Sequence, residues 1–181
     1  MKWIVHGERR IYDSPWVALA LADVEIPEGE RFEHHVVRMP HAAAGVVVHD
    51  PARGMLLLWR HRFITDTWGW EIPAGRVDEG ETPAQAGRRE TIEETGWSPG
   101  PLRHLTSYFP YNGVSDGRFH LFAAAGATQV GDPTDPSEAE RVEWLRQADV
   151  VAAVRAGRVG DGLSLTALLW FLAFEEAGPQ A

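Results

Sequence analysis

The chain has 181 residues, of which 44% are hydrophobic, and this composition predicts a soluble globular protein with a real core. Its 26 acidic and 17 basic residues give a formal net charge of −9. This balance argues against general nucleic-acid binding, because that function needs a basic face. The sequence contains no cysteine, which excludes disulfides and thiolate chemistry.

No apolar run in the sequence approaches the length of a membrane span, and the first residues lack the apolar core of a signal peptide. We therefore expect no membrane partner and a cytoplasmic location. The acidic balance does not exclude an anionic phosphate substrate, because a bound divalent cation reverses the local field.

The first forty residues predict β-strands. Two apolar-rich runs, residues 16–25 and 31–39, flank a stretch with Pro and Gly that suggests a hairpin turn. A third, shorter strand is expected over residues 3–12. We therefore expect residues 1–40 to form an N-terminal antiparallel extension and residues 41–181 to form the main domain.

The next two predicted strands are almost entirely apolar. Residues 43–49 and 55–60 surround a turn with Pro and Gly, and we expect these strands to be buried on both faces. Arg60 and Arg62 stand at the end of the second strand. Arginines near a carboxylate site are natural phosphate ligands, and the alternative is that they form salt bridges at its rim.

A short loop over residues 65–69 and a strand over residues 70–75 precede a helix with clear sequence signals at both ends. Thr82 is a good N-cap, and the proline after it suits the first helical position. Gln85 stands three residues after Thr82 and completes a capping box. Gly96 can adopt the left-handed conformation that ends a helix.

Carboxylates gather on one face of this predicted helix. Glu90 and Glu94 are four residues apart and Glu93 is three from Glu90, so the three lie close together. Such a face is either fully solvated, as on an ordinary charged helix, or neutralised by a cation. Oxygen ligands alone suit a hard cation, Mg²⁺ or Mn²⁺. Arg89 precedes Glu93 by four residues and can pair with it.

The remainder of the chain predicts a mixture of strands, polar loops and two helices. Ser164 is the expected N-cap of the last helix, and four leucines give that helix an apolar stripe that we assign to the core. The expected strands are residues 102–109, 119–125 and 142–145, the loops 110–117 and 128–139, the helices 149–156 and 165–176, and the stripe Leu165, Leu168, Leu169 and Leu172.

The segment from residue 75 to residue 97 matches the pattern Gly-x5-Glu-x7-Arg-Glu-U-x-Glu-Glu-x-Gly-U, where U is bulky and apolar. It resembles the Nudix box, with Thr91 in place of the usual aliphatic residue. The resemblance implies an α+β (mixed α/β) fold, a Nudix sandwich of sheet between helices. The matching residues are Gly75, Glu81, Arg89, Glu90, Glu93, Glu94, Gly96 and Trp97.

The resemblance also implies roles at the site. Glu90 and Glu94 would bind Mg²⁺ or Mn²⁺ directly, and the carbonyl of Ala74 would be a further ligand. Glu93 would lie close to the metal, and Arg89 would fix Glu93 or a neighbouring carboxylate. Glu81 would join the loop to the helix.

A general base is expected outside the box, in a late loop. By resemblance Glu138 would be this base and Glu140 a further metal ligand, and the two roles could be exchanged. The alternative is that both are solvated acids of a loop.

The chain is most similar to the Nudix subgroup that hydrolyses ADP-ribose and nucleoside diphosphate sugars. The resemblance implies that Arg62, Arg60 and Glu71 bind the substrate, and that the N-terminal strands form a homodimer interface. The segment 110–113 departs from the subgroup's usual Ser-Pro-Gly pattern, which bears on ADP-ribose specificity. Any of three tryptophans near the box could stack on a base, namely Trp59, Trp68 and Trp70.

The expected function is therefore the metal-dependent hydrolysis of ADP-ribose or a related nucleoside diphosphate sugar to a nucleoside monophosphate and a sugar phosphate. One alternative is a Nudix hydrolase that acts on nucleoside triphosphates or dinucleotides. Another is a regulator that binds a nucleotide without catalysis. The intact carboxylates and the lack of a basic segment favour the enzyme.

Overall fold

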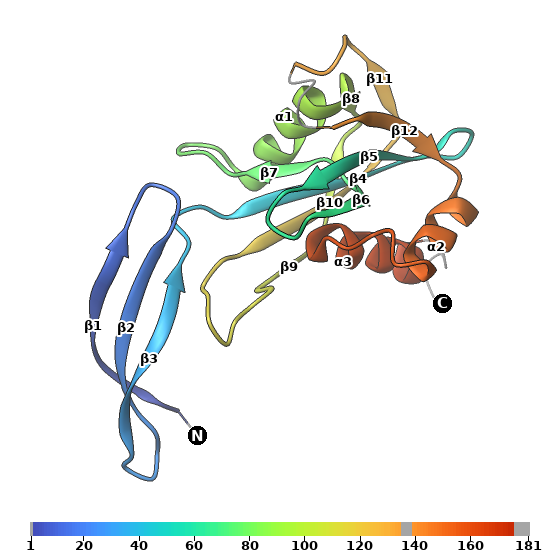
Figure 1. Ribbon diagram of the computed structural model, residues 1–181. Coiled ribbons are helices and arrows are strands. Elements are labelled where there is room, and N and C mark those ends of the chain that lie inside the picture. The colour runs from blue at the N-terminus through green and yellow to red at the C-terminus, as the bar shows by residue number, and fades with distance from the viewer. Residues whose placement is uncertain (1, 135–138, 176–181) are drawn as a thin grey trace. The chain divides into compact units, whose positions relative to one another are not determined.

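The computed structural model describes residues 2–134 and 139–175. Contacts along the chain divide it into two compact units. The smaller combines Met1–Ala42 with Phe109–Arg118, and the larger combines Ala43–Tyr108 with Phe119–Ala181. Figure 1 labels the elements of each unit.

Three antiparallel strands form the sheet of the smaller unit, in the order β1 (Ile4–Asp13), β2 (Ala18–Glu25) and β3 (Arg31–Arg38) (Figure 1). The expected strands are all present, and β1 is shifted by one residue from the predicted range 3–12. Along β2 every second side chain is buried, which is the pattern of a strand with one covered face.

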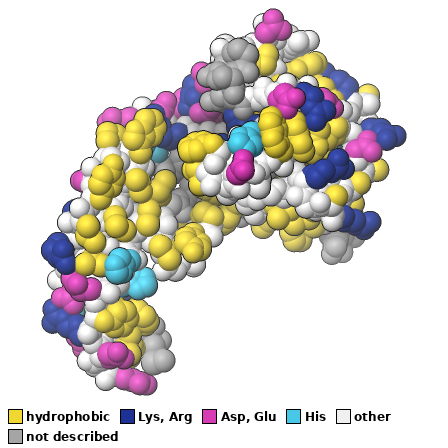
Figure 2. Space-filling view, viewed as in Figure 1, with side chains coloured by type: hydrophobic (Ala, Val, Ile, Leu, Met, Phe, Trp, Pro, Cys, Tyr) yellow, Lys and Arg dark blue, Asp and Glu magenta, His cyan; other side chains and the backbone are white. Residues whose placement is uncertain are grey.

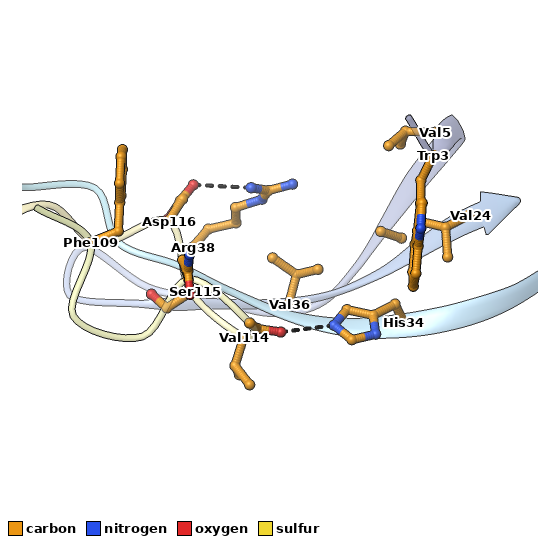
Figure 3. Close-up of a pocket in the computed structure, with 13 residues that line it drawn as sticks. Trp3, Val5, Val24, His34, Val36, Arg38, Phe109, Val114, Ser115 and Asp116 are labelled. Atoms are coloured by element: carbon orange, nitrogen blue, oxygen red, sulfur yellow. Dashed lines mark hydrogen bonds and ion pairs between the residues drawn. The ribbon is translucent and has the colours of Figure 1, made fainter. Parts of the chain in front are cut away.

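The segment Phe109–Arg118 packs on this small sheet. Val37 donates its N–H to the carbonyl of Val114 at 2.8 Å, and the Asp116 carboxylate accepts the N–H of Met39 at 2.9 Å. Arg38 and Asp116 form an ion pair at 3.1 Å. The segment and the strands enclose a groove of about 610 Å³, which Figure 3 shows with the contact from His34 to the segment. The sequence indicated only a polar loop here, because its partners are distant along the chain.

A mixed sheet is the centre of the larger unit. Its main strand order is β12-β5-β4-β10-β9, with β6 paired to β5 and β7 to β4, and β4 and β10 are parallel. The strands are β4 (Ala43–Asp50), β5 (Gly54–Arg62), β6 (Thr67–Glu71), β7 (Ala74–Arg76), β9 (Leu102–Tyr108), β10 (Phe119–Ala125) and β12 (Arg141–Leu145). The interiors of β4 and β5 are buried, as their apolar sequences predicted.

Helices cover both faces of this sheet (Figure 1). Helix α1 (Pro83–Thr95) packs through Ala86 on a cluster around Val46 and Leu56, whereas α2 (Gln147–Arg155) and α3 (Gly162–Trp170) pack on the opposite cluster around Leu57. A π-helical turn, Phe171–Glu175, continues α3. This arrangement confirms the predicted α+β sandwich. Among the described residues no helix is both long enough and apolar enough to cross a membrane.

The predicted strand over residues 70–75 is wrong, because the structure divides it into β6 and β7. Pro73 lies at the break, has no N–H to donate, and accepts the N–H of Val46 with its carbonyl at 3.0 Å. The predicted loop over residues 65–69 is correspondingly too long, since β6 begins at Thr67. Two short strands, β8 (Trp97–Pro99) and β11 (Ala127–Gln129), pair with each other where no strand was expected.

The predicted cap of the last helix is also wrong. Asp161 is the N-cap of α3, and its Oδ2 accepts the N–H of Ser164 at 2.8 Å. Ser164 is instead fully buried, and its hydroxyl accepts the N–H of Ile72 at 3.1 Å. Leu168 is buried as expected, but Leu169 is 47% exposed. The helix is apolar on most positions, so its sequence allows more than one stripe.

Candidate active site

The helix that carries the carboxylates begins and ends where the sequence predicted. The Thr82 hydroxyl accepts the N–H of Gln85 at 3.3 Å, and the Gln85 side chain accepts the N–H of Thr82 at 2.8 Å. Gly96 ends the helix in the left-handed conformation, with φ 74°. A Cβ at Gly96 would lie 2.3 Å from the carbonyl oxygen of Gly131, so glycine is required for space as well as for φ.

Arg89 joins the carboxylates on the outer side of α1. Its Nη1 donates to Glu90 at 2.7 Å and to Glu93 at 2.9 Å, and its Nε donates to Glu81 at 2.9 Å. Glu81, followed by Glu90 and Glu93, therefore raises the pKa of Arg89, and Arg89 in turn lowers the pKa of Glu81. The expected pairing of Arg89 with Glu93 is present, and Glu81 joins the loop to the helix.

Glu90 packs directly on the backbone of β7. A Cβ on Gly75 would lie 2.1 Å from the carboxyl carbon of Glu90, so any other residue here would displace that carboxylate. The glycine of the box therefore lets the carboxylate approach the strand. This contact places the Glu90 carboxylate beside Gly75, the residue that follows Ala74.

Glu94 lies on the buried side of α1. One of its oxygens accepts Nη1 of Arg60 at 2.8 Å, and the other accepts the N–H of Ala74 at 2.9 Å. The side chains of Glu94 and Arg60 are 3% and 7% exposed. Arg60 also lies 3.8 Å from Glu71, so one buried guanidinium stands between two carboxylates. The sequence signal for this pair was the occurrence of Arg60, together with Arg62, at the end of an apolar strand.

Arg62 is the exposed neighbour of this buried cluster. Its Nε donates to Glu71 at 2.9 Å, and its Nη2 donates to the second oxygen of the same carboxylate. The hydrogen bonds that Arg62 donates to Glu71 raise the pKa of Arg62. Arg60 and Arg62 therefore both form ion pairs in this structure, as the sequence allowed, and Glu71 links them.

The late loop is described only in part. Glu138 lies outside the described residues. Glu140 is exposed, and its N–H donates to the carbonyl of Trp59 on β5 at 2.9 Å. Trp59 also stacks near Trp68, with ring centroids 6.2 Å apart, while Trp70 is buried. Trp68 is thus the exposed member of the three tryptophans near the box.

The donor set of α1 suits a hard divalent cation in kind, since it consists of carboxylate oxygens. Within the described ranges, however, no three His, Asp or Glu side chains converge as a metal site. Glu90 and Glu93 contact Arg89, whereas Glu94 contacts Arg60 and the Ala74 N–H. A cation at α1 would therefore share these carboxylates with Arg89 and Arg60.

The sandwich and the arginine-linked carboxylates of α1 define a class of phosphoanhydride-cleaving enzymes, the pyrophosphohydrolases. The chain belongs to the Nudix family, because the family model described as NUDIX domain matches residues 39–163. The predicted family and enzyme class are therefore confirmed. Nudix hydrolases generally use divalent metal ions.

Individual relatives cover most of the chain. A CMP-5'-(N-acetyl-N-hydroxy-3-aminopropyl)phosphonate hydrolase of Streptomyces rubellomurinus is 43% identical over 172 residues, which cover 93% of this chain and 83% of the relative. An ADP-ribose pyrophosphatase of Bacillus subtilis is 27% identical and covers 94% and 92% of the two chains. The crystal structure of an ADP compounds hydrolase matches with a TM-score of 0.86 at 15% identity, over 100% and 98% of the chains, which shows the shared fold.

Proposed function

We propose that the chain hydrolyses a phosphoanhydride that joins a nucleoside monophosphate to a second, smaller group, with Mg²⁺ or Mn²⁺ as its cofactor. ADP-ribose and related nucleoside diphosphate sugars are the first candidate substrates, and the products are a nucleoside monophosphate and a sugar phosphate. The observation that carries the proposal is the set of carboxylates on α1, which Arg89 and Arg60 position from two sides.

A nucleotide joined to a phosphonate is the second candidate substrate. The relative named for a CMP-linked phosphonate is 43% identical to this chain, whereas the ADP-ribose pyrophosphatase of Bacillus subtilis is 27% identical. Both substrates contain a nucleoside 5′-phosphate in an anhydride bond, and they differ in the group beyond it. Cleavage of the second would release CMP and a free phosphonate.

In the proposed mechanism Glu90, Glu94, Glu140 and the Ala74 carbonyl would hold the cation. When bound, a divalent cation neutralises phosphate oxygens and lowers the pKa of a water molecule. Arg89 orients Glu93 and Glu90 through its fixed fork of donors. These side chains position charge around a reaction in which the chain itself forms no covalent bond.

The arginines and the late loop have complementary roles in this proposal. Arg62, supported by Arg60 and Glu71, contacts the oxygens of the substrate. Glu138 is the proposed base, and Glu140 is the alternative. The base takes a proton from water, the water oxygen bonds to one phosphorus, and the bridging P–O bond breaks so that its electron pair leaves with the other product.

We further propose that the active protein is a homodimer joined through the smaller unit. Strand β1 is exposed along all ten of its residues, among them Ile4, Val5 and Ile11. Figure 2 shows hydrophobic side chains gathered on the visible face of these strands. An edge strand with exposed apolar side chains is a template for pairing with another chain. A Val5→Lys variant should be monomeric by light scattering, and a wild type that is monomeric at every concentration would contradict the dimer.

A substrate panel tests the proposed reaction. We expect ³¹P NMR to show a nucleoside monophosphate and a second phosphorus product from ADP-ribose, a nucleoside diphosphate sugar or a CMP-linked phosphonate, only when Mg²⁺ or Mn²⁺ is added. Nucleoside triphosphates and dinucleotides serve as competing substrates. Faster turnover of these compounds would favour the alternative hydrolase, and no turnover of any compound would favour a binding protein. The cytoplasmic location stays a prediction.

A further inference from the structure

The larger unit contains a second cavity, and Arg62 and Glu71 form part of its wall. It lies between the β5–β6 hairpin and the loop that joins α2 to α3, and its volume is about 500 Å³. The N–H of Trp70 on β6 donates to the carbonyl of Arg158 in that loop at 2.8 Å, which fixes the loop at the strand edge. Pockets of this size are typical of sites for small organic ligands.

Two charged residues of the cavity wall each keep one polar atom that makes no hydrogen bond to another described residue. Arg62 uses Nε and Nη2 on Glu71, which leaves its Nη1. Asp161 uses Oδ2 to accept the N–H and the hydroxyl of Ser164 at 2.8 and 2.7 Å, which leaves its Oδ1. The wall therefore offers one donor that carries positive charge and one acceptor that carries negative charge.

The cavity adjoins the carboxylates of α1. Glu71 in its wall lies 3.8 Å from Nη1 of Arg60, and the same nitrogen lies 2.8 Å from Glu94. Glu71 chiefly, and then Asp161 and Glu94, raise the pKa of Arg62, as expected for carboxylates that lie near its guanidinium. Glu71 thus links the cavity wall to the ion pairs that hold Glu94 of α1.

The rest of the wall suits a short carbon skeleton with hydroxyl groups. Trp68 is half-exposed, supplies an aromatic surface and stacks with Trp59. Glycines 69, 157, 160 and 162 form much of the remaining wall and leave room close to the backbone.

We propose that this cavity binds the non-nucleotide half of the substrate, a hydroxyl-bearing organic phosphate or phosphonate. Arg62 Nη1 donates to an oxygen of the distal phosphoryl or phosphonyl group, and Asp161 Oδ1 accepts the proton of a sugar hydroxyl or an N-hydroxy group. Asp161 is thereby the residue that determines leaving-group specificity. This inference rests on the proposed function for its link to catalysis, but ligand binding tests it without turnover.

The test uses calorimetry to measure how tightly the isolated non-nucleotide halves of the substrate bind to the full-length protein. Ribose 5-phosphate is compared with methyl phosphate, and (N-acetyl-N-hydroxy-3-aminopropyl)phosphonate with propylphosphonate. We expect the hydroxyl-bearing member of at least one pair to bind about 10- to 100-fold more tightly, as a hydrogen bond to a charged acceptor predicts. The pair with the larger difference identifies the sugar or the phosphonate as the natural half.

Asp161→Asn is the decisive variant. The asparagine oxygen can still accept the Ser164 N–H and start α3, which directs the amide nitrogen, a donor, into the cavity. The preference for the hydroxyl-bearing ligand should therefore disappear while the melting temperature stays close to that of the wild type. Asp149→Asn removes an equal charge from the first turn of α2, away from the cavity, and should preserve the preference.

Three outcomes would overturn the inference: a wild type that binds both members of each pair equally, a preference that survives in Asp161→Asn, or a preference that Asp149→Asn also abolishes. Turnover is measured separately. Where the halves bind as expected but no anhydride is cleaved, the proposed function fails and the ligand site stands. Where anhydrides are cleaved but the preference is absent, the ligand site fails and the proposed function stands.

Discussion

Two arginines organise the two sides of helix α1 in different surroundings. Arg89 is 29% exposed and contacts Glu81, Glu90 and Glu93 near solvent, whereas Arg60 is 7% exposed and lies between Glu94 and Glu71. Water can replace a lost partner in the first cluster but not in the second. The same ion-pair chemistry should therefore serve mainly catalysis at Arg89 and mainly the integrity of the fold at Arg60.

The largest effect is expected from Arg60→Met. The variant leaves buried Glu94 without its cation, and removal of one partner of a buried ion pair typically costs about 3–5 kcal/mol of unfolding free energy. Urea denaturation followed by fluorescence measures this loss. Arg146→Met, which breaks an exposed pair with Asp149, is the control and should leave the midpoint nearly unchanged. Equal midpoints for the two variants would remove the distinction between the clusters.

An intermediate effect, on activity, is expected from Arg89→Lys. Lysine keeps the charge but cannot bridge Glu81, Glu90 and Glu93 at once, because it lacks the fork of the guanidinium. Loss of a group that orients metal ligands typically lowers activity or metal affinity by about 10- to 100-fold. Steady-state hydrolysis at saturating Mg²⁺ and a thermal melt separate the two properties. A variant that loses stability and keeps its activity would reverse the role we assign.

The sequence predicted the Arg89 cluster but not the Arg60 cluster, and the reason is distance along the chain. Arg89 and Glu93 are neighbours on one helix turn, so local spacing is sufficient. Arg60 and Glu94 meet only because β5 and α1 pack together, which spacing does not encode. In the same way Thr82 was recognisable as a cap from local signals, whereas Asp161 replaced Ser164 as a cap because tertiary packing buries the serine.

Strand prediction shows the same division. Strands β4 and β5 were predicted correctly because nearly all of their residues are apolar, which indicates burial on both faces. The break between β6 and β7 depends on which neighbour each short strand pairs with, and β8 and β11 form only because they pair with each other. The part of the late loop that holds Glu138 stays a prediction, since it lies outside the described residues.

The smallest effect is expected at Asp50, outside both clusters. Hydrogen bonds from the Arg53 side chain and backbone and from the Ala52 N–H lower the pKa of Asp50 from 3.8 to about 2. A lowered pKa means that the carboxylate stabilises the fold above pH 4 and that this contribution is lost as the pH falls toward 2. The melting temperature of Asp50→Asn should therefore fall slightly below that of the wild type at neutral pH. The two should converge near pH 2, and a constant difference would contradict this assignment.

Direct titration of Mn²⁺ tests the central claim that the carboxylates of α1 bind the catalytic cation. Glu90→Gln is the suitable variant, because Glu94→Gln would also disturb the buried pair with Arg60. Electron paramagnetic resonance of free Mn²⁺ should show one or more ions bound by the wild type. It should also show an affinity at least tenfold lower in Glu90→Gln, with hydrolysis lost in parallel. Equal Mn²⁺ affinity and equal turnover in a correctly folded variant would contradict the account.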